Sequence, residues 1–218
     1  MVDNTALEYF LSLLDEGERI LSSDPLCEKH TMLSYTLKEK EEKPVEDIKV
    51  DESFSVNECR ACHAWVNRVQ FVPAKESSEC KVMCIISSPK INRLLTPKGE
   101  MFFLKWFQGI GLDISNVALT TLVKCPLKSF SALEANACKG FLKEEMTRMK
   151  PERLLLLGED VAHYMLRRND SMNEMRGRKY KINNIPTFVS YSPDEFVEHY
   201  NELRAPVWQD LLFLKENL

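Results

Sequence analysis

Four cysteines at two distant places in the chain have the type and spacing of metal ligands. Cys59 and Cys62 form a C-x2-C pair, and Cys125 and Cys138 follow far downstream with twelve residues between them. Two close thiolates can hold one metal and leave room for ligands from elsewhere in the fold. Zinc sites usually use two close pairs, so the wide second spacing favours an iron–sulfur cluster. Zinc and the absence of any metal stay as the alternatives.

The other cysteines carry no such pattern. Cys84 lies inside an apolar run, where a small buried hydrophobic residue is the usual interpretation, and Cys27 and Cys80 stand alone. No apolar run is long enough to span a bilayer, and the N-terminus shows no secretion signal. We therefore expect a cytoplasmic protein without a membrane partner. In that compartment thiols and metal ligands are more common than disulfides.

Four short apolar runs alternate with helix-like segments in the second half of the chain. The runs cover residues 82–86, 117–123, 154–157 and 185–189, and the helix-like segments cover residues 102–107, 131–149, 161–168 and 206–214. Continuous apolar runs of this length are typical of parallel strands buried on both faces. We expect an α/β fold whose ligands bind at the carboxyl ends of the strands, in the loops after Ile86, Thr121, Leu157 and Ser190.

The first part of the chain differs in charge from the rest. Residues 1–58 carry fifteen acidic and six basic side chains, whereas the remainder carries a net charge of +5. Apolar residues at helical spacing from Leu7 to Leu21 predict an amphipathic helix. The chain is expected to divide into an N-terminal helical extension over residues 1–37, a charged linker over residues 38–54, and a globular domain over residues 55–218.

Five short motifs keep a fixed order along the globular domain. They are Cys59-Arg60-Ala61-Cys62, Val123-Lys124-Cys125, Cys138-Lys139-Gly140-Phe141-Leu142, Met175-Arg176-Gly177-Arg178 and Val207-Trp208-Gln209-Asp210-Leu211. This ordered set resembles the iron–sulfur uracil-DNA glycosylases, family 4 of the uracil-DNA glycosylase superfamily. The resemblance implies a three-layer α/β/α fold with a central four-stranded parallel sheet. It also implies a [4Fe–4S] cluster held by Cys59, Cys62, Cys125 and Cys138, and DNA as a partner.

The sequence departs from this family at the positions that carry its chemistry. The family's Gly-Glu-x-Pro-Gly loop reads Ile86-Ser87-Ser88-Pro89-Lys90, so Ser87 replaces the acid that positions water. The Thr-Tyr-His-Pro-Ser loop reads Ser190-Tyr191-Ser192-Pro193-Asp194, so Ser192 replaces the histidine. Leu94 replaces the phenylalanine that stacks on the base, and Thr121 replaces the asparagine that reads it. Asp194 could substitute as the acid, although a helix N-cap is its simpler interpretation.

A compact basic run offers a surface for phosphates. Arg176, Arg178, Lys179 and Lys181 surround Gly177 and Tyr180. Such a run can bind a nucleic-acid backbone by charge while the aromatic ring stacks on a base, although most charge runs are solvated faces. Lys90 and Lys124 are further candidate phosphate contacts.

Three functions are compatible with these features. The first is a uracil-DNA glycosylase-like iron–sulfur protein that binds DNA or a DNA-processing partner and has lost much or all of its base-excision activity. The second is an active DNA glycosylase with a rebuilt pocket, in which Ser192, Asp194 or Thr121 acts on uracil or another damaged base. The third is an interaction module without a nucleic-acid role. Four losses beside retained cluster positions favour the first, in which the protein is not an enzyme.

Overall fold

The computed structural model describes residue 56 and residues 58–218. The predicted N-terminal helix and charged linker lie outside these residues, so the division of the first 54 residues stays a prediction. Across the described part of the chain, no helix combines the length and apolar character that crossing a membrane requires.

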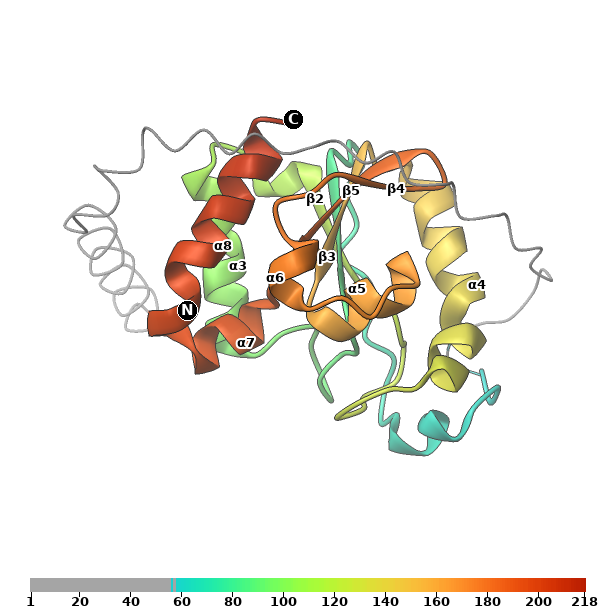
Figure 1. The fold of residues 1–218 in the computed structure, drawn as a ribbon. Helices are drawn as coiled ribbons and strands as arrows, with labels where there is room; N and C mark the ends of the chain where they lie inside the picture. Colours follow the sequence, from blue (N-terminus) through green and yellow to red (C-terminus); the bar gives the residue numbers. More distant parts are fainter. Residues whose placement is uncertain (1–55, 57) are drawn as a thin grey trace, which may run out of the picture. The chain divides into compact units, whose positions relative to one another are not determined.

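A single five-stranded sheet organises the described residues, in the order β2-β1-β3-β5-β4 (Figure 1). Its strands are β1 (Val82–Ile86), β2 (Val117–Thr121), β3 (Arg153–Leu157), β4 (Tyr180–Ile182) and β5 (Ile185–Ser190). β1 pairs in parallel with β2 and β3, and β3 pairs in parallel with β5. The prediction of an α/β fold built on a parallel sheet is therefore confirmed.

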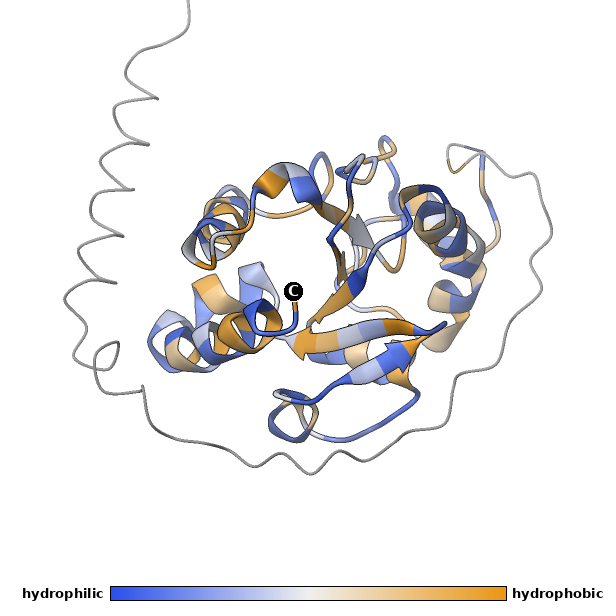
Figure 2. Cartoon of the chain, turned by 90° about the horizontal axis from the view of Figure 1, so that it is seen from above, coloured by the Kyte–Doolittle hydropathy of each residue, from blue (hydrophilic) through white to orange (hydrophobic). Residues whose placement is uncertain are grey.

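Helices cover both faces of this sheet. One face packs against α3 (Pro97–Gly109), α7 (Pro193–Glu198) and α8 (Tyr200–Lys215); the other packs against α4 (Ala132–Met149), α5 (Glu159–Leu166) and α6 (Met172–Met175). Two short 3-10 helices, η1 (His63–Asn67) and η2 (Ile114–Asn116), complete the elements. β1 alternates between the faces, with Met83 and Ile85 in one core cluster and Cys84 in the other. Figure 2 shows the hydrophobic strands lying between these helices.

The strand count differs from the four strands expected. β4 pairs antiparallel with β5 at the edge of the sheet and is only three residues long, with Lys181 exposed between two buried neighbours. A short edge strand that carries charge gives a weak apolar signal. The sequence feature that could have indicated β4 is the Asn183-Asn184 pair. The φ angles of these two residues, 49° and 64°, match a tight hairpin turn.

Two helices begin earlier than their apolar residues indicate. α3 starts at Pro97, where the side chain of Thr96 accepts the Gly99 N–H and caps the helix. α8 starts at Tyr200 and contains Pro206 in its interior, so this proline does not mark its beginning. Polar first turns lack the apolar periodicity that sequence patterns detect, which explains both differences.

Candidate functional site

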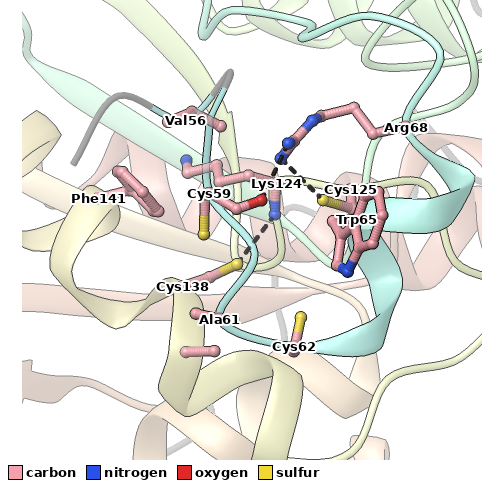
Figure 3. A pocket seen from close by; sticks show the side chains of 11 residues that line it. Val56, Cys59, Ala61, Cys62, Trp65, Arg68, Lys124, Cys125, Cys138 and Phe141 are labelled. Atoms are coloured by element: carbon pink, nitrogen blue, oxygen red, sulfur yellow. Dashed lines mark hydrogen bonds between the residues drawn. The ribbon is translucent and has the colours of Figure 1, made fainter.

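Cys59, Cys62, Cys125 and Cys138, the four predicted metal ligands, line one pocket, which we call the cysteine pocket (Figure 3). They come from three segments far apart in the sequence. Cys59 and Cys62 directly precede η1, Cys125 follows β2, and Cys138 lies on α4. Val56, Trp65 and Phe141 contribute apolar surface to the same pocket. The structure therefore gathers four free thiols in one pocket with a partly apolar lining.

Polar contacts hold the segments that carry these cysteines together. The Lys124 backbone N–H donates to Cys138 Sγ at 3.4 Å, which joins the loop after β2 to α4. Arg68 donates from Nη1 to Cys125 Sγ at 3.5 Å and from Nη2 to the Cys59 carbonyl at 3.0 Å. Arg68 thus connects the N-terminal cysteine pair to the loop after β2. Hydrogen bonds to the sulfurs are also one of the ways in which proteins tune iron–sulfur clusters.

The chemistry of the lining is compatible with an iron–sulfur cluster or with a zinc ion. Within the described residues, no three His, Cys, Asp or Glu side chains are grouped as ligands of one metal ion. Zinc would draw every sulfur to about 2.3 Å from a single point. A four-iron cluster binds one cysteine at each iron, so its ligands surround a larger body. Four thiols line one cavity here, which is the number of protein ligands that either centre takes.

Burial keeps the two central thiols protonated when no cation is near. It raises the pKa of Cys138 to about 11, and it also raises the pKa of Cys125, where the Arg68 guanidinium opposes the shift. Iron or zinc binds the thiolate form, so a bound cation would invert this preference. Both thiols would then be available as ligands.

The polar positions predicted for chemistry lie at one edge of the sheet. Ile86 pairs with Thr121 and Leu157 pairs with Ser190, so the loops after these strands start side by side. A methyl group added at Gly158 would lie 3.9 Å from the Cβ of Ser192. Ser87, Thr121 and Ser192 therefore lie together where the parallel strands end, which we call the carboxyl edge of the sheet.

The residues at this edge are small, and most are covered. Thr121 is 2% exposed, and Ser87 is half-buried. Leu94 is half-buried and packs against the core cluster on the α3 face. Leu94, at the position predicted to contact the base, therefore already uses part of its side-chain surface for packing against the core.

Comparison with known proteins identifies the family to which this fold belongs. Residues 74–212, more than half of the chain, match the family model described as Uracil DNA glycosylase superfamily. The chain belongs to this superfamily. The type-4 uracil-DNA glycosylase of Saccharolobus solfataricus is 26% identical over 190 residues, which cover 79% of this chain and 86% of the relative. The type-4 uracil-DNA glycosylase of Sulfurisphaera tokodaii is 23% identical over 175 residues, covering 72% and 79%.

Within this uracil-DNA glycosylase fold, Asp194 joins three segments instead of capping a helix. Its Oδ1 accepts hydrogen bonds from Thr96 N at 3.1 Å and from Thr96 Oγ1 at 2.6 Å, and its Oδ2 lies 3.0 Å from Lys90 Nζ. The N-cap of α7 is Ser192, whose hydroxyl accepts the Glu195 N–H at 3.2 Å. The N-cap interpretation of Asp194 is therefore wrong. A side chain at Gly99 would collide with the Asp194 carboxylate, so α3 packs directly against it.

Two residues of the basic run face inward. Arg176 Nε donates to Asp210 Oδ2 at 2.7 Å, and its side chain is 12% exposed. The Arg176 guanidinium also lies over the Tyr191 ring. Tyr180 is buried and donates its hydroxyl to the Met175 carbonyl, so it cannot stack on a base. Arg176 is thus held by the fold, and the exposed cations left for the predicted DNA contacts are Arg178, Lys179 and Lys181 of the basic run, together with Lys90.

Lys124 is a buried ion-pair partner, which corrects its interpretation as a phosphate contact. It is 2% exposed, and its Nζ lies 2.7 Å from Glu145 Oε2 and 2.8 Å from Thr120 Oγ1. The sequence analysis did not predict this ion pair. Glu145 could have indicated it, because an acid on the buried face of α4, beside Cys138, Leu142 and Met149, needs a partner of opposite charge.

Proposed function

We propose that this superfamily member is an iron–sulfur protein that binds DNA and has lost much or all of its base-excision activity. The observation that carries the proposal is the engagement of Asp194. It is the acid that sequence reasoning offers as a substitute at the carboxyl edge, and two hydrogen bonds from Thr96 and an ion pair with Lys90 already satisfy it. Both oxygens of this carboxylate already have partners within the fold, which leaves it poorly placed to orient a water molecule at the sugar.

Cutting an N-glycosidic bond requires groups that this edge does not supply. The departing base develops negative charge, and a preorganised donor aimed at it is worth roughly 3–4 kcal/mol. A positioned acid or base adds about 10²–10⁴-fold. Ser87 has no acidic group with which to orient water. Ser192 is a neutral donor on a short stem, and the Glu195 N–H that its oxygen accepts holds it at the N-cap of α7. These replacements predict a large loss of rate.

The cluster has a structural role in this proposal. Cys59, Cys62, Cys125 and Cys138 would hold a [4Fe–4S] cluster. The bound cluster would cross-link the segment before η1 to α4 and to the loop after β2. Zinc stays the alternative cofactor for the same four thiols.

DNA binding is proposed along the carboxyl edge and its neighbouring loops. β4 runs antiparallel to β5 and starts opposite Thr187, so Arg178 and Lys179 precede it on the side where β5 ends. Lys90 follows β1 and is 49% exposed despite its ion pair with Asp194. Exposed cations beside the ends of the strands can contact phosphates without any cutting chemistry.

Removing two of these cations tests the DNA contact. We expect the double variant Arg178→Ala, Lys179→Ala to bind a uracil-containing duplex more weakly, and to lower the slope of log affinity against log salt by up to about 2. Fluorescence anisotropy at several salt concentrations measures both quantities. The matched control is Lys215→Ala, which removes an exposed charge near the opposite edge, where Arg153 at the start of β3 contacts the C-terminal residues. Equal loss in both proteins would contradict the assignment.

An active glycosylase with a rebuilt pocket is the second candidate, and one observation favours it. Ser192 accepts a hydrogen bond through its oxygen and therefore keeps its own proton to donate near Gly158. This alternative requires Ser192→Ala and Asp194→Ala each to lower turnover markedly. Our account instead expects Asp194→Ala to lower stability, because Lys90 and Thr96 lose their shared partner. Thermal unfolding beside the excision assay separates the two outcomes.

A further inference from the structure

A second cavity lies between α4, the end of α5 and the turn that joins β4 to β5. Its volume is about 490 Å³, and none of the residues that line it also lines the cysteine pocket. Small-molecule sites commonly measure about 300–1,000 Å³ and combine an apolar lining with a few polar groups. The proposed DNA-binding function leaves this cavity without a role.

The inner surface of the cavity is apolar. Leu122, which is fully buried, and Leu142, which is 4% exposed, both line it. Met146 from α4 and Met165 from α5 line it as well. Methionine side chains are unbranched and adapt to ligands of irregular shape. This surface can therefore bury the hydrocarbon part of a ligand.

Cationic side chains line the same cavity from both helices. Lys139 comes from α4, and Arg167 is the C-cap residue of α5. Among the described residues, no aspartate or glutamate lines the cavity. Burial lowers the pKa of Lys139, and the positive charges of Arg167 and Lys143 lower it further. A ligand anion placed between Lys139 and Arg167 would relieve this repulsion.

A hydrogen bond between the two helices limits the length of a ligand. The Tyr164 hydroxyl donates to Asn136 Oδ1 at 2.7 Å, and Asn136 is the α4 lining residue nearest the start of that helix. Tyr164 therefore bridges α4 and α5 at one end of the cavity. A hydrogen-bonded bridge at that end suits a compact ligand better than a continuous partner helix, which needs a groove open at both ends.

We propose that this cavity binds a small anionic amphiphile, a molecule with an apolar body and one acid group. The apolar body packs on Leu142, Met146 and Met165, and the acid group lies between Lys139 and Arg167. A carboxylate and a phosphate share this chemistry, and either could come from a free metabolite or from the head group of a lipid.

A matched pair of fluorescent probes tests the proposal on the intact, iron-loaded chain. 8-Anilinonaphthalene-1-sulfonate carries an anionic group that N-phenyl-1-naphthylamine lacks, and the two share their apolar rings. We expect Lys139→Met and Arg167→Gln each to weaken binding of the sulfonate by about tenfold or more, the size of one charge-assisted hydrogen bond. Binding of the neutral probe should change less than about twofold. Lys215→Met is the charge-removal control and should bind both probes as the wild type does.

A further variant and two competing acids show which chemical group the cavity binds. Met146→Gln should weaken both probes, because it makes the shared apolar wall polar. Displacement of the sulfonate by decanoate or by decyl phosphate would support the proposal and show which acid group is preferred. Unchanged sulfonate binding in both cation variants, or no displacement by either acid, would overturn it. Binding to phosphatidylglycerol vesicles without displacement by the free acids would also overturn it, in favour of a membrane surface.

Discussion

Replacing Lys124 by methionine is expected to lower the free energy of unfolding by about 3–5 kcal/mol, the usual effect of breaking a buried ion pair. The Lys124 ammonium lies 2.8 Å and 2.7 Å from the two Glu145 oxygens and donates to the Thr121 carbonyl at 2.9 Å. The two side chains are only 2% and 9% exposed. The variant would leave the Glu145 carboxylate buried without a cation. Guanidinium unfolding of the variant and of wild type, both at equal iron content, measures the loss.

A triple variant provides the matched control for that loss. Lys124→Met combined with Glu145→Leu and Thr120→Val removes both charges and the hydroxyl that bonds to them. Burial lowers the pKa of Lys124, and the attraction of Glu145 opposes this shift without cancelling it. Replacing a buried pair by apolar groups is often neutral or stabilising. We expect the triple variant to be more stable than Lys124→Met alone. Equal or lower stability would contradict this account of the pair.

The second large effect expected is the loss of nearly all iron from Cys138→Ala. Cys138 lies on α4, and the cysteine pocket brings it together with three cysteines from two other segments. In the proposed cluster, removing one of four thiolates would leave an iron without its protein ligand and would open the cluster to solvent and oxidation. Iron and sulfide per chain, with the visible absorbance of protein purified without oxygen, measure the outcome.

Cys84→Ala separates a ligand effect from general damage to the fold. Cys84 is fully buried within β1 and belongs to the core cluster on the α3 face. Its substitution should lower stability modestly and leave the iron content unchanged. If Cys84→Ala and Cys138→Ala retained the same iron, the assignment of Cys138 as a ligand would be wrong.

Patterning along the chain predicted most of the sheet. The parallel strands are built around short apolar runs because helices cover both faces of the sheet, so residues 82–86 and 154–157 stand out from the helices around them. The same logic failed at β4, which lies at the edge and exposes Lys181. The first turn of α3 was missed for a related reason, since its cap is polar.

Side-chain partners far apart in the sequence could not be predicted in the same way. Periodicity identifies which face a residue occupies and leaves its partner open. A lysine after an apolar run resembles a solvated cation, yet Lys124 reaches Glu145 on α4. An acid beside the start of a helix resembles an N-cap, yet Asp194 bonds to Thr96 and Lys90. The cysteines were easier to predict because thiols at this spacing have few other uses, although metal binding itself stays a prediction.

The most direct test of the account is a single-turnover excision assay on the intact chain with its cluster loaded. Protein in excess is incubated with single-stranded and duplex oligonucleotides that carry one uracil or another damaged base, and abasic sites are then revealed by alkali. We predict DNA binding with base release at the rate of the protein-free control. Release of any base well above that rate, and its disappearance in Ser192→Ala, would contradict the proposal that the carboxyl edge has lost its bond-breaking groups.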